Sequence, residues 1–97
     1  MNRDDLVKVL QQQGGNLRQR FGVQHLSLFG SVSRNEATAE SDVDMLVEFA
    51  GPVTFDRYMD LKFFLEDLLQ RQVDLATTGA LRPRLKAAIE KDLIRVT

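Results

Sequence analysis

The sequence predicts an α/β domain, of the α+β kind, in which helices cover a small mixed β-sheet. Segments with helical periodicity take turns with short segments that alternate apolar and polar residues, and this order favours a sheet covered by helices. The chain has 97 residues, 43% of them apolar, with no internal repeat or low-complexity tract. One domain over residues 1–97 with a single core is therefore expected.

The first part of the chain is predicted to form two short helices or one kinked helix. Apolar residues recur there at helical spacing: Leu6, Val7, Val9, Leu10, Leu17 and Phe21. The pair Gly14-Gly15 interrupts this pattern, and Gly22 ends it.

Three strands, a further short terminal strand and two longer helices are expected in the rest of the chain. Residues 25–29 predict a strand that runs into a turn at Gly30, and a short helix should begin at Ser31. The other predicted strands are residues 42–49, residues 72–76 and a short terminal strand at 93–96. Thr54 is suited to cap a helix that reaches about Gln70, and Pro83 suits the first turn of a last helix.

Two aspartates in the second predicted strand indicate a cation site. Asp42 and Asp44 are separated by one residue, so on a strand their carboxylates point to the same face and repel each other unless a cation lies between them. Asp74, in the apolar third strand, is the natural third carboxylate. Mg²⁺ prefers such oxygen ligands together with substrate phosphates, and three carboxylates could hold two ions about 3.5 to 4 Å apart.

Gly30 and Ser31 supply the features of an anion site beside these carboxylates. Glycine lets the backbone approach a phosphate, and N–H groups at a helix start and the serine hydroxyl can donate to it. If these residues and Asp42 serve one site, the first two strands must run antiparallel and the sheet must be mixed.

Each of these features also has a purely structural interpretation. Asp42 and Asp44 could cap a turn with Ser41, Asp74 could be an exposed residue on an edge strand, and Gly30-Ser31 could be an ordinary turn. Arg34 could reach a phosphate or pair with Glu36 or Glu40 on the surface.

Charge and composition limit the partners that we expect. The net charge is −1, which argues against direct nucleic-acid binding. Residues 35–56 contain six acids and no base, whereas residues 81–97 contain five bases and two acids, so one region should attract cations and the other anions. There is no cysteine, no apolar run long enough to span a membrane and no signal-peptide pattern at the start, so we expect a cytoplasmic protein without a membrane partner.

Taken together, residues 28–34 (LFGSVSR), 41–47 (SDVDMLV) and 73–75 (VDL) resemble the DNA polymerase beta-like nucleotidyltransferase superfamily. Within it the chain is similar to the minimal nucleotidyltransferase (MNT), the antitoxin of a HEPN/MNT toxin-antitoxin pair. The helix before the first strand and the Ala80-Leu81-Arg82-Pro83 entry to the last helix also match. Family members often have Ala where Ser33 stands and Gly where Asn35 stands, and Asn tolerates positive φ better than most residues.

The resemblance implies the nucleotidyltransferase fold and a set of roles. Gly30 and Ser31 would hold the β- and γ-phosphates of ATP, with Arg34 as a further nucleotide-binding candidate. Asp42, Asp44 and Asp74 would be catalytic residues and ligands of two Mg²⁺ ions.

By the same resemblance, the enzyme would transfer AMP from ATP to a hydroxyl, that of a tyrosine, on a partner HEPN toxin, as a type VII antitoxin and protein adenylyltransferase. A hetero-oligomer with that toxin is expected. The alternative is a non-catalytic antitoxin or binding subunit that neutralises its partner by occlusion. An antibiotic-modifying or nucleic-acid-extending transferase of the same superfamily is a third interpretation, which the absence of an acceptor domain and the near-neutral charge disfavour.

The helix predicted from Thr54 carries more apolar surface than one core face requires. Tyr58, Leu61, Leu65 and Leu68 form one stripe, and a second line at i, i+4, i+8 holds Phe55, Met59 and Phe63. The second line could pack on a neighbouring helix or form a partner interface.

Overall fold

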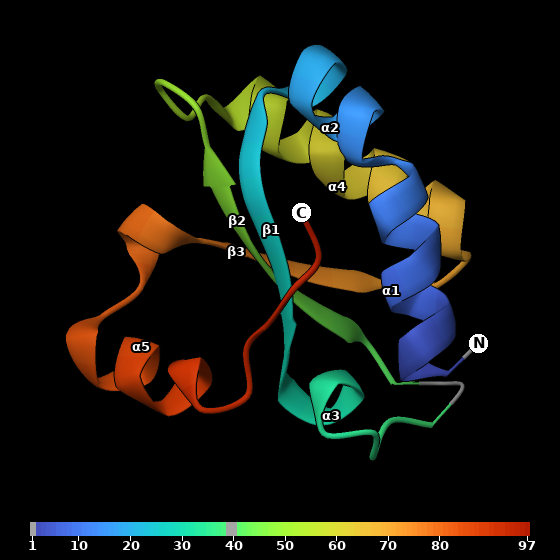
Figure 1. The fold of residues 1–97 in the computed structure, drawn as a ribbon. Coiled ribbons are helices and arrows are strands. Elements are labelled where there is room, and N and C mark those ends of the chain that lie inside the picture. The colour runs from blue at the N-terminus through green and yellow to red at the C-terminus, as the bar shows by residue number, and fades with distance from the viewer. Residues whose placement is uncertain (1, 39–40) are drawn as a thin grey trace.

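A computed structural model describes residues 2–38 and 41–97. It contains a four-stranded sheet in the order β3-β2-β1-β4 (Figure 1). The strands are β1 (Val23–Phe29), β2 (Val43–Phe49), β3 (Val73–Thr77) and β4 (Ile94–Arg95). β1 pairs antiparallel with both β2 and β4, and β2 pairs parallel with β3. The expected mixed sheet is therefore confirmed.

Helices α1 (Arg3–Gln12), α2 (Gly14–Phe21) and α4 (Phe55–Leu69) lie on one face of the sheet, and α5 (Pro83–Glu90) lies on the opposite side (Figure 1). Two short elements follow strand ends: α3 (Gly30–Ser33) after β1, and the 3₁₀ turn η1 (Thr78–Ala80) after β3. The N-terminal stripe thus forms two helices. Within the described residues no helix is long and apolar enough to cross a membrane.

Local sequence signals set the helix ends. Asn2 and Asp5 form a reciprocal capping box, in which the Asn2 Oδ1 atom accepts from the Asp5 N–H at 2.9 Å. Gly22 ends α2 in the left-handed conformation (φ 69°). The Thr54 hydroxyl accepts from the Arg57 N–H at 3.2 Å and caps α4, as expected, and Pro83 is in the first turn of α5.

The core lies between the sheet and the three helices on one face. Val43, Met45 and Val47 of β2 are fully buried there, so the alternate residues of β2, including Asp44, face the other side. From α4, Leu61 and Leu65 complete the core. The second strand begins at Val43 and not at Asp42, because Val43 is the first residue that pairs with β3.

Candidate active site

Asp74 of β3, Asp44 of β2 and Gly30, which directly follows β1, form a row across one end of the sheet. Asp44 pairs with Phe29 of β1 on one side and with Asp74 of β3 on the other. Gly30 follows Phe29 directly, so it stands beside Asp44 at the end of β1. The fold thus brings the glycine and two of the three carboxylates together, although they are far apart in sequence.

Asp42 lies just before β2, with an exposed side chain. The backbone before it is tied to the start of β3 by Arg71, whose guanidinium donates to the carbonyls of Thr38 (2.9 Å) and Ser41 (2.6 Å). The Ser41 hydroxyl accepts from the Thr38 N–H at 3.0 Å, so Ser41 closes this turn. Arg71 is a positioning residue that the sequence analysis missed, because nothing in a lone arginine shows which carbonyls it will reach.

Gly30 lies against the carboxylate of Asp44. Its φ is +71°, a backbone conformation that residues other than glycine rarely adopt. A Cβ atom at this position would also overlap the Asp44 carboxylate. The backbone can therefore approach whatever Asp44 holds. Ser31 is next in the chain and half-buried.

Two side-chain hydrogen bonds hold α3, the short helix that begins at Gly30, in place. The Ser33 hydroxyl donates to the Gly30 carbonyl at 2.9 Å, and Arg3 of α1 donates to the Ser33 carbonyl at 3.0 Å. Asn35, just beyond α3, has φ 61°. This left-handed conformation explains how Asn can stand where the family often has Gly.

Arg34 is engaged in ion pairs on the surface. Its Nε atom lies 3.1 Å from Glu36 Oε2, and its Nη1 atom lies 2.8 Å from Asp92 Oδ2. The alternative partner Glu40 lies outside the described residues. Arg34 still acts on the site at a distance, since its charge lowers the pKa of Asp44. A direct contact with phosphate would need at least one of these pairs to open.

Negative charge accumulates at Asp44. Burial is the main cause that raises the pKa of its carboxyl above the ordinary range, and the charges of Asp74 and Asp42 and a hydrogen bond with Asp74 raise it further. The carboxyl of Asp44 therefore lies near enough to Asp42 and Asp74 to be affected by their charges. A bound cation would relieve this repulsion.

The residues at this end of the sheet fit a Mg²⁺ site that is completed by substrate. In residues 2–38 and 41–97 no group of three or more acidic, histidine or cysteine side chains is placed so that it could hold a metal ion by itself. Mg²⁺ rarely uses such a group, since it binds one or two carboxylates and takes its other ligands from water and phosphates. The oxygen donors of Asp44 and its neighbours, together with the open backbone approach at Gly30, meet that need.

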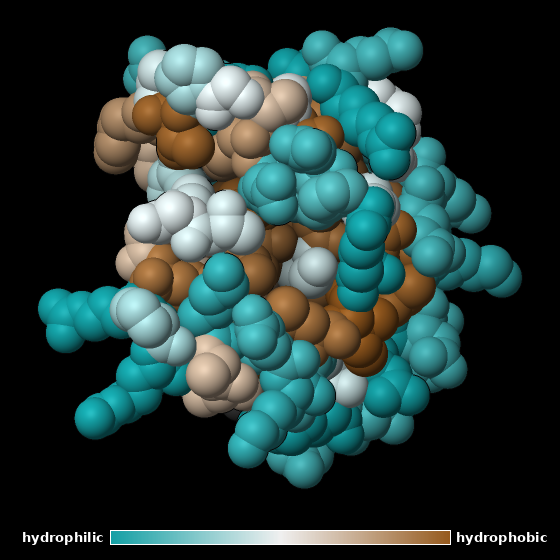
Figure 2. All heavy atoms as spheres, turned by 60° about the vertical axis from the view of Figure 1, so that its left-hand side comes forward, coloured by the Kyte–Doolittle hydropathy of each residue, from teal (hydrophilic) through white to brown (hydrophobic). Residues whose placement is uncertain are grey.

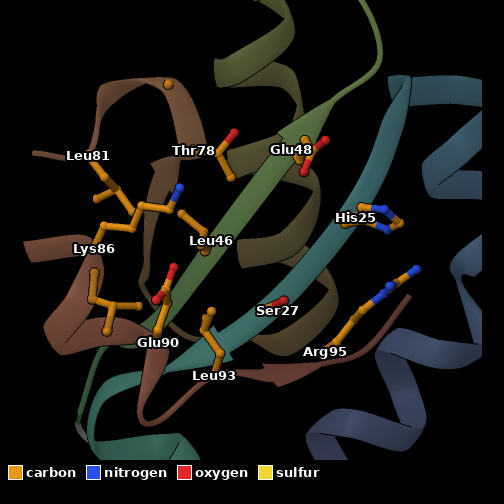
Figure 3. Close-up of a pocket in the computed structure, with 12 residues that line it drawn as sticks. His25, Ser27, Leu46, Glu48, Thr78, Leu81, Lys86, Glu90, Leu93 and Arg95 are labelled. Atoms are coloured by element: carbon orange, nitrogen blue, oxygen red, sulfur yellow. The ribbon is translucent and has the colours of Figure 1, made fainter. Parts of the chain in front are cut away.

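A cleft of about 550 Å³ lies on the open face of the sheet, and its lining does not include Gly30, Asp44 or Asp74 (Figure 3). Its lining includes Ser27 of β1 and Leu46 of β2, which are cross-strand partners two residues along the strands from Phe29 and Asp44. Lys86 extends from α5 toward the strand that carries Leu46. Figure 2 turns this side toward the viewer, and apolar atoms gather in the middle of the face with polar side chains around them. The sequence analysis did not foresee the cleft, because it depends on where α5 packs.

A second surface feature lies on α4. Phe55 is 76% exposed and Phe63 is 59% exposed, whereas Met59 between them is half-buried. No neighbouring helix among the described residues covers the two phenylalanines, so the packing interpretation of this line does not hold for them.

Comparison with known proteins agrees with the geometry. The nucleotidyltransferase domain family matches residues 10–96. The protein adenylyltransferase MntA of Thermococcus cleftensis is 36% identical over 93 residues, which cover 96% of this chain and 94% of that protein.

Two solved structures are similar to this chain. A proposed minimal nucleotidyltransferase has 34% sequence identity and a TM-score of 0.82, over 97% of this chain and 95% of its own. A complex of the tri-AMPylated HEPN toxin of Shewanella oneidensis with its MNT antitoxin matches at a TM-score of 0.68 and 19% identity, over 94% of this chain and 71% of the other. At that identity the second likeness concerns the fold.

Proposed function

This chain belongs to the nucleotidyltransferase domain family, and from that premise we propose that it transfers AMP from ATP to a hydroxyl group of a HEPN toxin, acting as its antitoxin. The observation that carries the proposal is the row of Gly30, Asp44 and Asp74 across three adjacent strands. The backbone at Gly30, which can approach a phosphate, lies beside the carboxylates. Nucleotidyl transfer needs this arrangement.

Each residue of the row has a distinct task in this proposal. The backbone at Gly30 and the hydroxyl of Ser31 hold the β- and γ-phosphates. Asp42, Asp44 and Asp74 hold Mg²⁺, one or two ions, which when bound neutralises the phosphates and polarises the reacting oxygens. Arg34 supports the phosphates through its charge.

The transfer is an in-line displacement at the α-phosphorus of ATP. The acceptor oxygen forms a bond to that phosphorus, the bond to the oxygen bridging to the β-phosphate breaks, and its electron pair leaves with pyrophosphate. The acceptor proton passes to the carboxylate of Asp74, which is exposed and lies on the side of Asp44 away from Gly30. A tyrosine hydroxyl is the acceptor that we propose.

The partner surface is the exposed apolar line on α4. Phe55 and Phe63 present large aromatic side chains to solvent, and such side chains are enriched in protein interfaces. A groove between the start of α4 and the end of β3, which includes Val53, Phe55 and Leu81, continues this apolar surface. The HEPN toxin of the Shewanella oneidensis complex carries AMP groups, which supports a partner of this class.

Intact mass spectrometry tests this function. Incubation of this chain with ATP, Mg²⁺ and the HEPN protein encoded beside it should increase the mass of that protein by one or more adenylyl groups. The Asp74→Asn variant should still form the complex but leave the mass unchanged. The substitution removes a carboxylate proposed for catalysis, whereas the proposed partner surface on α4 stays intact.

Neutralisation by occlusion alone is the competing function, and the exposed phenylalanines favour it. In that case wild type and Asp74→Asn would neutralise the toxin equally well and neither would change its mass. That outcome would replace adenylylation as the function of this chain.

A further inference from the structure

Asp74 stands on an edge strand. Within residues 2–38 and 41–97, β3 pairs with β2 alone, so one side of its backbone has no strand to bond to. The strand is five residues long, and Asp74 is its second residue. One ladder of hydrogen bonds holds an edge strand less firmly than two ladders hold a central one, and the ends of elements open most readily. Asp74 would therefore be poorly fixed if β2 alone held its strand.

Two side chains of α4 take the place of a neighbouring strand. The carboxylate of Glu66 accepts from the Val73 N–H at 3.1 Å, and the Tyr58 hydroxyl donates to the Leu75 carbonyl. Both backbone groups belong to buried residues, so each would cost free energy if it had no partner. The two bonds lie one residue before and one residue after Asp74.

The alternation of the strand explains why these bonds leave the carboxylate free. The Val43 N–H of β2 donates to the Gln72 carbonyl at 2.9 Å, so the backbone of Gln72 and of Asp74 bonds toward β2. The backbone of Val73 and Leu75 therefore points to the outer edge, where α4 meets it. The side chain of Asp74 is exposed, whereas those of Val73 and Leu75 enter the core on the other face.

We propose that Tyr58 and Glu66 are positioning residues for Asp74: they clamp the edge strand so that its carboxylate stays level with Asp44. This inference rests on the proposed function, in which Asp74 receives the acceptor proton. A reacting group must be held within about 0.5 Å of its productive position, and a misplacement of about 1 Å can slow the chemistry about 100-fold. Loss of either bond would free one side of the strand to move.

The clamp belongs to the helix that carries the proposed partner surface. Tyr58 follows Phe55 by three residues, and Glu66 follows Phe63 by three. Residues three apart are neighbours on a helix. The helix that presents the two phenylalanines to the partner thus also holds the strand of Asp74, so the position of the partner and that of the carboxylate are set by one element.

Rates of AMP transfer test the inference. The preformed complex of this chain with the HEPN partner is mixed with saturating ATP and Mg²⁺, and intact mass spectrometry follows the first adenylyl group. Tyr58→Phe removes only the donating hydroxyl, and Glu66→Leu removes the acceptor at nearly constant size. Each should lower the rate at least about tenfold. The Kd for ATP with Mg²⁺, measured by calorimetry, should change less than about threefold, because Gly30 and Ser31 hold the phosphates.

Two further variants are the controls. Glu66→Gln keeps an acceptor oxygen for the Val73 N–H and should transfer AMP within about twofold of the wild-type rate. Asp67→Leu removes an exposed carboxylate from the next position of the same helix and should also keep the wild-type rate.

Amide hydrogen exchange gives a readout that does not depend on activity. In Glu66→Leu the Val73 amide loses its acceptor and should exchange at least about tenfold faster than in wild type, and Glu66→Gln should restore its protection. The Met45 amide in the central strand β2 should exchange at the wild-type rate in both variants, which shows that the fold as a whole is intact.

The outcomes separate this inference from the function on which it rests. Wild-type transfer rates in folded Tyr58→Phe and Glu66→Leu overturn the inference, because a bond that only stabilises the fold does not change the rate of folded molecules. Equal loss in Glu66→Gln and Glu66→Leu, or an unchanged Val73 exchange rate in Glu66→Leu, overturns it as well. If Tyr58→Phe does not fold, the Glu66 variants decide. If wild-type protein transfers no AMP, the proposed function itself fails, and the clamp inference falls with it.

Discussion

At the scale of single residues, Gly30 has two independent reasons to lack a side chain. Its φ of +71° disfavours any Cβ atom, and that atom would overlap the Asp44 carboxylate. The first reason alone costs about 1–2 kcal/mol for most residues, and the second displaces the carboxylate that is proposed to hold Mg²⁺. Backbone conformation and chemistry are therefore coupled at this position.

Gly30→Ala should accordingly lose both stability and nucleotide affinity. Gly15→Ala is the matched control, because Gly15 lies in α2, has no positive φ, and a Cβ there would meet nothing within 4 Å. The control should keep wild-type ATP affinity and gain up to about 1 kcal/mol of unfolding free energy. Urea unfolding and ATP titration measure both effects. Wild-type ATP affinity in folded Gly30→Ala would place the nucleotide elsewhere.

Asp44 should destabilise the protein in the absence of metal. Its raised pKa means that the folded state binds a proton more tightly than the unfolded chain does, so ionisation of Asp44 costs stability. The cost is absent below the ordinary carboxyl pKa of about 4, and it is fully present above the raised folded value. A carboxylate whose ionisation lowers the stability of the fold is consistent with a role as a metal ligand.

Asp44→Asn should therefore be more stable than wild type near neutral pH without divalent cations, and this advantage should vanish as the pH falls below about 4. Urea unfolding at several pH values, with EDTA present, measures the difference. Asp60→Asn on the exposed side of α4 is the control and should show no comparable gain. An Asp44→Asn variant that is less stable at neutral pH would contradict the assigned electrostatics.

At the scale of elements, the sequence analysis predicted the strands and the mixed sheet correctly, and it missed what depends on packing. The i, i+2 spacing of Asp42 and Asp44 predicted a shared face, and the need for one site predicted the antiparallel pairing of β1 with β2. Such patterns report which face a residue occupies. The position of α5, which creates the cleft, and the pairing of Arg34 with Asp92, 58 residues away, depend on tertiary packing and leave no local pattern.

The α4 helix illustrates the limit of periodicity. In its first stripe Leu61 and Leu65 are fully buried, whereas Tyr58 and Leu68 are partly buried against the core. The second line left two interpretations open, because helical spacing alone does not say whether another element covers it. Exposure of Phe55 and Phe63 removes the intramolecular interpretation for those two residues.

Phe63→Ser should weaken the complex with the HEPN partner at least about tenfold, because loss of an exposed aromatic anchor removes apolar contact area. ATP affinity should stay unchanged, since α4 lies on the opposite side of the sheet from α5 (Figure 1). Asp67→Ser, also exposed on α4, is the control and should leave the complex intact. Calorimetry with the purified partner measures the affinity. Undiminished binding by a Phe55→Ser/Phe63→Ser double variant would move the interface to another surface.

At the scale of the whole molecule, binding at the carboxylate row should be visible as global stability. The row joins β1, β2 and β3, so a ligand held by it links the ends of three strands that belong to one sheet. Any ligand that binds only the folded state stabilises it by mass action, by about 2.7 kcal/mol at a concentration of 100 times Kd. The same carboxylates that repel one another without metal then become the source of stabilisation.

Mg²⁺ or Mn²⁺ together with ATP should therefore raise the melting temperature, and the Asp42→Asn/Asp44→Asn variant should lose most of that gain. The variant should melt at or above the wild-type temperature without ligand, because it lacks the partly buried charge of Asp44, so a missing gain cannot be attributed to poor folding. Differential scanning fluorimetry with ATP alone, metal alone and both separates the contributions. The gain with both should exceed the sum of the separate gains, since substrate phosphates complete the coordination of Mg²⁺. A double variant that keeps the wild-type gain would show that metal and nucleotide bind away from this row.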